Sequence, residues 1–131
     1  MSEPVTITID GREGTVPGGQ LLIKAAEDNG TYIPRFCWHS RMEPVGMCRM
    51  CLVDIGRPQI DRATGQPLLN EDGTPKIQFG PKLDTACTNT VSQGMVVVGM
   101  SDKVKAGRED ILEFLLTSHP LDCPARCGCA C

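Results

Sequence analysis

TITIDGREGTVPGGQLLIKAAEDNG, residues 6–30, is the stretch that decides the fold of this chain. Its first four residues alternate polar and apolar side chains, which is typical of a strand with one buried face. Asp10-Gly11 is a strong turn signal, so residues 13–16 are expected to return as the partner strand. The stretch therefore predicts that a β-hairpin opens the protein.

A helix is expected directly after this hairpin. Residues 20–29 have the apolar spacing of one helical face, and Gly30 is suited to end the helix; the face consists of Leu21, Leu22, Ala25 and Ala26. Two later apolar segments, residues 52–55 and 94–100, are expected to be further strands. A hairpin, a helix across one face and strands that complete a mixed sheet predict an α+β fold of the β-grasp class.

Two segments fall outside this core pattern. Residues 56–83 are polar and contain several prolines and glycines, which indicates an inserted loop or a hairpin around the turn at residues 70–73. An amphipathic helix is expected from Lys103 until His119-Pro120 ends it. We therefore expect a domain over residues 1–101, followed over residues 102–131 by a helix and a short Cys-rich tail.

Four of the 8 cysteines lie in the pattern C-x10-C-x2-C-x35-C, namely Cys37, Cys48, Cys51 and Cys87. An iron-sulfur cluster needs thiolates on one concave stretch of backbone, and a tight C-x2-C turn supplies two of them while more distant cysteines close the site. The spacing predicts a [2Fe-2S] cluster and one-electron transfer. From reach alone, Cys48 and Cys51 would bind one iron and the other two cysteines the second.

The composition of the chain limits which partners, cellular locations and cysteine chemistry are expected. The net charge of −3 comes with no basic run of the kind that follows phosphates, so nucleic acid is not an expected partner. No apolar stretch is long enough to span a bilayer and no secretion signal is apparent, so we expect neither direct membrane insertion nor export. Without export, the cysteines favour metal binding over disulfides. Structural zinc in a β-grasp interaction module, or such a module without metal, remains an alternative.

The residues around the cysteines resemble a known family. Cys37-Trp38-His39 and residues 46–53 are similar to the N-terminal [2Fe-2S] ferredoxin-type region of a subunit of NADH-quinone oxidoreductase, the bacterial counterpart of the 75 kDa subunit of respiratory complex I. The resemblance covers residues 3–124, and its first gap of ten residues differs from the gap of four in plant-type ferredoxins. It implies a β-grasp domain with a [2Fe-2S] cluster on Cys37, Cys48, Cys51 and Cys87.

The resemblance also implies the complex in which the chain acts and its cellular location. It places the chain among the peripheral-arm subunits of the respiratory complex, including the flavin- and NADH-binding subunit, on the cytoplasmic face of the inner membrane. In that setting the chain carries electrons and is not catalytic alone. Related modules occur in NAD-linked hydrogenases and some formate dehydrogenases, which are the alternative; the insertion and Gly99-Met100-Ser101 favour the respiratory subunit.

A second site begins near the end of the chain. His119 and Cys123 match the first two positions of H-x3-C-x2-C-x5-C, the pattern of a [4Fe-4S] site in the same family. The third position is Arg126 and the fourth lies beyond residue 131, so a [4Fe-4S] cluster is expected only in an intact full-length form. We expect residues 125–131 to be a non-native tail from a truncation or frame shift. The alternative is an improvised metal site that adds Cys127, Cys129 and Cys131.

Overall fold

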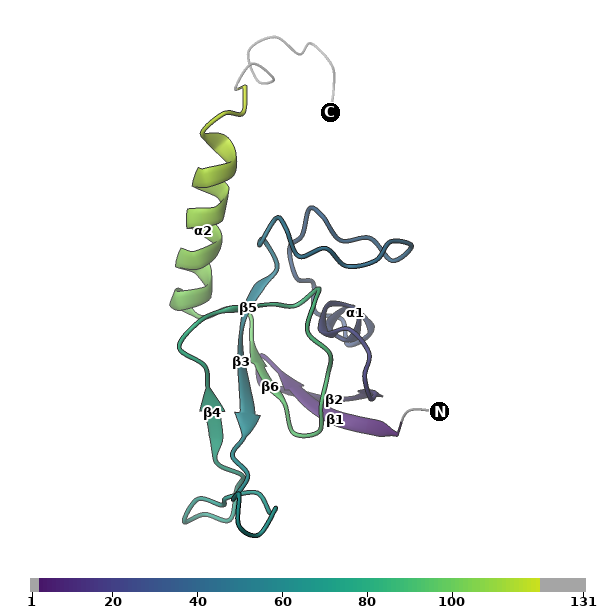
Figure 1. Cartoon of the computed structure of the whole chain (residues 1–131), viewed down its shortest axis with the longest axis vertical. Helices are drawn as coiled ribbons and strands as arrows, with labels where there is room; N and C mark the ends of the chain where they lie inside the picture. Colours follow the sequence, from purple (N-terminus) through teal and green to yellow (C-terminus); the bar gives the residue numbers. More distant parts are fainter. Residues whose placement is uncertain (1–2, 121–131) are drawn as a thin grey trace.

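The computed structural model describes residues 3–120 and shows a mixed sheet with one helix packed on its face (Figure 1). The strand order is β2-β1-β6-β3-β4, and β5 pairs with β3 off this path. The predicted α+β architecture of the β-grasp class is confirmed. The elements are β1 (Pro4–Ile9), β2 (Arg12–Pro17), α1 (Leu22–Asp28), β3 (Leu52–Pro58), β4 (Ile77–Phe79), β5 (Asp84–Thr85), β6 (Val96–Val98) and α2 (Asp102–Leu116).

The opening hairpin forms as predicted. Asp10 and Gly11 have φ angles of 47° and 81°, the left-handed pair that a tight two-residue hairpin turn requires. Ile9 pairs with Arg12 across this turn, and β1 runs parallel to β6 on its other side. The Asp10 carboxylate accepts a hydrogen bond of 2.7 Å from the backbone N–H of Gly99, which ties the turn to the end of β6.

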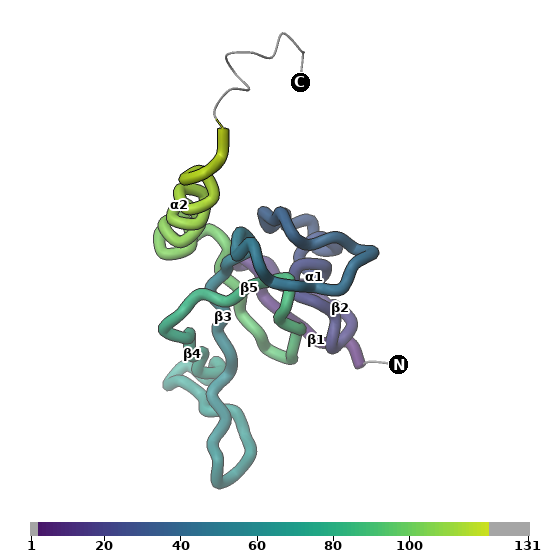
Figure 2. Tube along the Cα trace, turned by 45° about the horizontal axis from the view of Figure 1, so that its top comes forward, coloured from purple at the N-terminus to yellow at the C-terminus, as the bar shows by residue number. Residues whose placement is uncertain are grey.

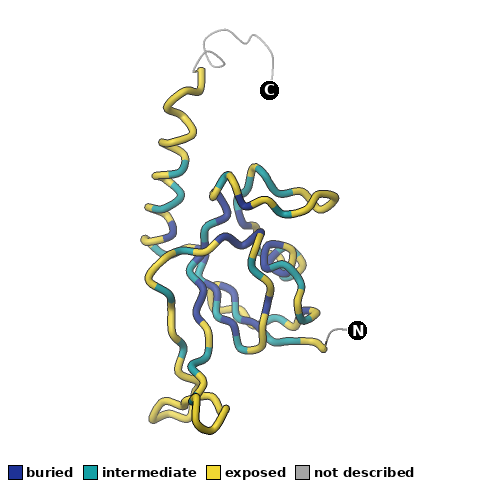
Figure 3. Tube along the Cα trace, in the orientation of Figure 1, coloured by how far each residue is buried: buried dark blue, intermediate teal, exposed yellow. Residues whose placement is uncertain are grey.

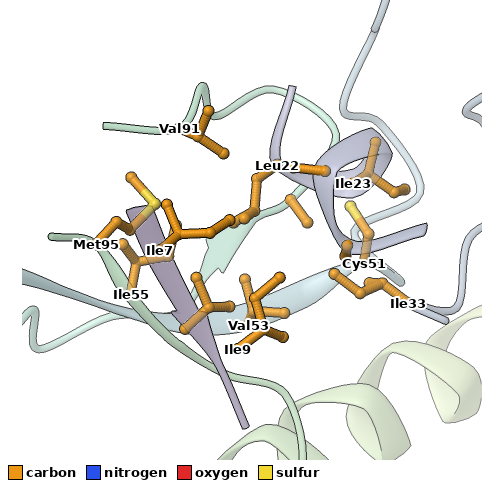
Figure 4. Close-up of a cluster of buried hydrophobic side chains, with 14 of the residues drawn as sticks. Ile7, Ile9, Leu22, Ile23, Ile33, Cys51, Val53, Ile55, Val91 and Met95 are labelled. Carbon is orange, nitrogen blue, oxygen red and sulfur yellow. The ribbon is translucent and has the colours of Figure 1, made fainter. Parts of the chain in front are cut away.

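Alternating residues of the strands fill the core together with α1 (Figure 4). Ile7 and Ile9 of β1 and Val53 and Ile55 of β3 are buried on one face of the sheet, where the buried residues of α1 cover them. Burial of each such side chain contributes about 1.5–3 kcal/mol. The period-two pattern of the strands is therefore the main reason why this face turns inward.

Helix α1 starts two residues later than the sequence predicts. Its N-cap residue, Leu21, provides no side-chain hydrogen bond. Instead, the backbone N–H groups of Leu22 and Ile23 donate to the carbonyls of Asn89 and Ala86 at 2.8 and 3.0 Å. A segment distant in sequence thus satisfies the free amides at the start of the helix.

The insertion continues the sheet. β4 pairs antiparallel with the end of β3, so β3 runs to Pro58 rather than ending at residue 55. The predicted turn is present, because Gly73 N–H donates to the Asn70 carbonyl at 3.0 Å. Its two arms meet where Lys76 N–H donates to the Leu68 carbonyl at 2.7 Å. Beyond this pairing the insertion is largely exposed (Figure 3).

Helix α2 projects past the end of the sheet at which β5 lies (Figure 1). Ser101 caps it, since its Oγ accepts a hydrogen bond of 3.3 Å from Val104 N–H. Val104 is the buried residue of the helix, whereas Leu112, Phe114, Leu115 and Leu116 are exposed. The predicted apolar face is thus real, but its distal half lies beyond the sheet. No helix within residues 3–120 is long and apolar enough to cross a membrane.

Candidate iron-sulfur site

Two segments far apart in sequence bring the four cysteines together. Cys51 ends the loop over residues 37–51 and directly precedes β3, while Cys87 follows β5. The short β3–β5 ladder pairs Leu52 with Thr85, and Ala86 N–H donates to the Cys51 carbonyl at 3.0 Å. This pairing fixes the second cysteine segment against the first. In Figures 1 and 2 the loop lies at the same end of the molecule as α2.

The four thiols span the boundary between core and surface. Cys51 and Cys87 are each 1% exposed and belong to the hydrophobic core. Cys37 and Cys48 are half-buried, and all four are free thiols rather than disulfides. Such a site has a water-excluded inner side and an outer side that is partly open to solvent.

Backbone N–H groups of the loop point at its sulfur atoms. Cys48 N–H donates to the Cys37 sulfur at 3.4 Å, and Met50 N–H donates to the Cys48 sulfur at 3.5 Å. Gly46 and Arg49 both have a φ angle of 61°, so the backbone alternates its direction around Cys48. Loops of this kind turn successive amides into one concavity that favours negative charge. A thiolate-bound cluster carries such charge.

The electrostatics of the thiols differ between the two sides. Burial raises the pKa of Cys48, but N–H donors from Met50, Cys37 and Phe36 outweigh it and hold this pKa below the ordinary value of a thiol. Burial, the neighbouring Cys51 side chain and the charges on the other cysteines raise the pKa of Cys87 to about 12. The surroundings of Cys48 therefore favour its thiolate form. Cys87 needs a positively charged metal centre nearby to lose its proton.

The thiols of the two segments influence one another. Cys48 N–H donates to the Cys37 sulfur at 3.4 Å, and the neighbouring Cys51 side chain helps to raise the pKa of Cys87. The grouping of Cys48 and Cys51 on one iron, expected from reach, stays a prediction. Within residues 3–120, no group of three or more His, Cys, Asp or Glu side chains is arranged to hold a single metal ion. A two-iron cluster with bridging sulfides is wider than one ion, and its ligands surround a larger space.

The two segments that carry these thiols pack closely against each other. A Cβ atom at Gly46 would lie 2.8 Å from the methyl carbon of Thr88, the residue after Cys87. Thr88 is held in turn by hydrogen bonds to the hydroxyl and the carbonyl of Thr85. The two cysteine-bearing segments therefore approach each other so closely at this point that a glycine is required.

Arg35 anchors the start of the loop to α1, a feature that the sequence analysis missed. Its guanidinium forms an ion pair with Glu27 of α1. It also lies 5.0 Å from the ring centroid of Tyr32 and 4.8 Å from that of Trp38. Aromatic residues on both sides of an arginine, within six residues of a cysteine motif, were the available signal.

The predicted second site is only partly within the described residues. His119 lies just after α2 and lines a groove of about 350 Å³ together with Phe36, Leu112, Leu115 and Leu116. Cys123, and with it the tail over residues 125–131, lies outside the described residues. The [4Fe-4S] assignment and the expectation of a non-native tail therefore stay predictions.

The fold and the thiol arrangement define a class of protein, a ferredoxin-like domain built to hold an iron-sulfur cluster. The chain belongs to the family of 2Fe-2S iron-sulfur cluster binding domains, whose model matches residues 2–101. An iron-sulfur cluster is the cofactor that this family binds. The residues described above fit it, since they supply four free thiols, N–H donors aimed at sulfur and a cradle that a Cβ atom would fill.

Particular relatives confirm the resemblance to the respiratory subunit. The chain is 43% identical over 120 residues to NADH-quinone oxidoreductase subunit 3 of Thermus thermophilus and 39% identical over 120 residues to the mitochondrial 78 kDa subunit of NADH-ubiquinone oxidoreductase of Candida albicans. It is 40% identical over 127 residues to a subunit of the NADH-quinone oxidoreductase of Mycobacterium tuberculosis. These matches cover 92–93% of the chain but only 13–15% of the relatives.

A solved structure shares the fold as well. It is an NAD+-reducing [NiFe]-hydrogenase in the H2-reduced state, with a TM-score of 0.67 and 26% sequence identity. The match covers 92% of this chain and 42% of the hydrogenase chain. The fold of this domain is therefore shared between two kinds of NAD-linked oxidoreductase.

Proposed function

We propose that the chain is a one-electron carrier whose [2Fe-2S] cluster is held by Cys37, Cys48, Cys51 and Cys87. The observation that carries the proposal is the convergence of these four free thiols from two segments 35 residues apart, in a chain that belongs to a cluster-binding family. A cluster of this type accepts and donates single electrons without bond chemistry on a substrate. The module is accordingly a carrier and not a catalyst by itself.

Different residues would stabilise the outer and the inner side of the cluster. The amides of Cys48 and Met50 stabilise negative charge on the outer sulfurs, at 3.4 and 3.5 Å. Burial of Cys51 and Cys87 excludes water from the inner side. The contact of Cys48 N–H with the Cys37 sulfur and the shared burial of Cys51 and Cys87 support one iron on the first two cysteines and the other iron on the last two. The amides and the burial together bear on the reduction potential.

For the larger setting, we propose electron transfer between NADH and quinone as part of a respiratory oxidoreductase. The support is the identity of 39–43% to subunits of NADH-quinone and NADH-ubiquinone oxidoreductases. The partners would be other peripheral-arm subunits, including the one that binds flavin and NADH, on the cytoplasmic side of the membrane. A full-length form would add the [4Fe-4S] site that starts at His119 and Cys123. The boundary between residues 101 and 102 is part of this proposal.

A second setting has its own support. The NAD+-reducing hydrogenase shares the fold over 92% of the chain, so the same electron-carrying domain in a hydrogenase is the alternative. Subunits that co-purify with the chain distinguish the two settings, since a [NiFe] subunit would indicate the hydrogenase. The lower identity of 26%, against 43% for the respiratory subunit of Thermus thermophilus, favours the respiratory one.

The cofactor is tested on anaerobically purified protein. We expect visible charge-transfer bands, two irons and two sulfides per chain, and a rhombic electron paramagnetic resonance signal on reduction. Cys48→Ser should shift or destabilise the cluster, while the matched control Cys129→Ser should leave the spectrum intact. A colourless protein with stoichiometric zinc would sink the proposal. A spectrum lost only in the control variant would show that the ligand set is wrong.

A further inference from the structure

The first two turns of α2 pack directly on the strand that leaves the cluster loop. Val104 is fully buried, and Lys103 forms an ion pair of 3.1 Å with Asp54 of β3. A Cβ atom at Gly107 would lie 2.7 Å from the Leu83 side chain and 3.5 Å from that of Leu52. The helix therefore lies in close contact with the start of β3. Gly107 permits this close approach, and the ion pair of Lys103 with Asp54 helps to fix it.

Arg108 of α2 contacts the backbone directly after a cysteine of the candidate site. Its Nε and Nη2 atoms both donate to the Leu52 carbonyl, at 3.2 and 2.9 Å, and Leu52 follows Cys51 in the chain. Burial lowers the pKa of the guanidinium, while the charges of Asp10 and Cys51 raise it. An arginine stays protonated in such surroundings. A half-buried positive charge is therefore held at the backbone carbonyl of the residue that follows Cys51, an inner thiol of the site.

We propose that Arg108 is a positioning residue that raises the reduction potential of the cluster. Reduction adds one electron and no compensating charge, so the reduced form is the more negative one and gains more from a nearby cation. Two other charged residues lie near this contact or on the same helix. Asp10 offsets part of its field, and Lys103 is already paired with Asp54. The inference rests on the proposed cluster and goes beyond it, because it assigns a function to a helix outside the ligand loop.

The test is a potentiometric titration of the cluster-loaded protein, with dithionite as reductant and the resonance signal of the reduced cluster as readout. Arg108→Gln should lower the midpoint by a threefold to tenfold change in the oxidised-to-reduced equilibrium, about 30–60 mV for one electron. Arg108→Lys keeps the charge and should stay closer to the unsubstituted protein. Lys105→Gln is the matched control, since it removes the same charge from an exposed position of the same helix and should not shift the midpoint.

A second variant covers the case in which Arg108→Gln does not retain its cluster. Asp10→Asn removes the negative charge that faces Arg108 and tolerates the left-handed φ of 47°, so the midpoint should rise. A midpoint for Arg108→Gln equal to that of Lys105→Gln would overturn the inference, as would a fall in the Asp10→Asn variant. Absence of any cluster in the unsubstituted protein would overturn the proposed function itself, and the two failures are therefore distinguishable.

Discussion

Replacement of Gly46 by alanine probes the closest approach between the two cysteine-bearing segments. Two costs add at this position. The residue has a φ of 61°, which costs a residue with a side chain about 1–2 kcal/mol. The new Cβ atom would also lie 2.8 Å from the Thr88 methyl carbon, and overpacking of this kind costs about 1–3 kcal/mol. We expect a total loss of about 2–5 kcal/mol.

The contact with Thr88 cannot relax freely, and this allows the two costs to be separated. The Thr88 hydroxyl is hydrogen-bonded to Thr85, which fixes the methyl group in its direction toward Gly46. Thr88→Ser removes the methyl carbon and keeps the hydroxyl. In the background of Gly46→Ala it should recover the steric part, about 1–3 kcal/mol, and leave the conformational part.

The assay is urea unfolding followed by circular dichroism, with the visible absorption of the cluster recorded in parallel. For a slope of about 2 kcal/mol/M, a loss of about 3 kcal/mol lowers the midpoint by about 1.5 M. Gly65→Ala is the matched control, because Gly65 has a φ of 68° and nothing within 4 Å of the new Cβ atom. Equal losses for Gly46→Ala and Gly65→Ala, or no recovery by Thr88→Ser, would refute the reasoning.

Three further substitutions test the supports of the site. Arg35→Ala should cost about 1–3 kcal/mol and change the tryptophan fluorescence, because the guanidinium contacts two aromatic rings; an unchanged emission spectrum would contradict the contact. Ser101→Ala should cost about 1 kcal/mol in thermal unfolding, since the Val104 amide loses its cap, whereas Ser101→Asp should be nearly neutral. Asp10→Ala should lower the free energy of unfolding in urea by about 1 kcal/mol more than Asp10→Asn does. Alanine cannot accept the hydrogen bond from the Gly99 amide and does not tolerate the left-handed φ of the turn. Equal stability of the two variants would exclude this explanation.

The parts of the fold that depend on neighbouring residues were predictable from the sequence. The hairpin at Asp10-Gly11 and the turn at residues 70–73 are both present, because glycine and asparagine or aspartate side chains favour these backbone angles locally. The limits of α1 and β3 were less accurate. The N-terminal amides of α1 find their acceptors at Ala86 and Asn89, and β3 is extended by β4, so distant segments set both boundaries.

In the candidate site, too, some features could be predicted from the sequence and others depend on the tertiary structure. The spacing of the cysteines predicts the set of four, since ligand identity and the C-x2-C turn are properties of the sequence. The spacing does not decide how the four ligands divide between two irons, because that depends on the direction in which each thiol leaves the folded loop. Nor could Arg108 be recognised, since 56 residues separate it from the Leu52 carbonyl that it contacts.

The sequence by itself determined that this chain has a hairpin, a helix and a set of four cysteines with the spacing of a cluster-binding family. These features follow from local backbone preference and from the short reach between neighbouring ligands. Only the tertiary structure decided that Thr88 closes on Gly46 and that a cation of α2 contacts the backbone carbonyl next to Cys51. Each of these contacts joins segments that are distant along the chain, and packing of the whole core brings such segments together.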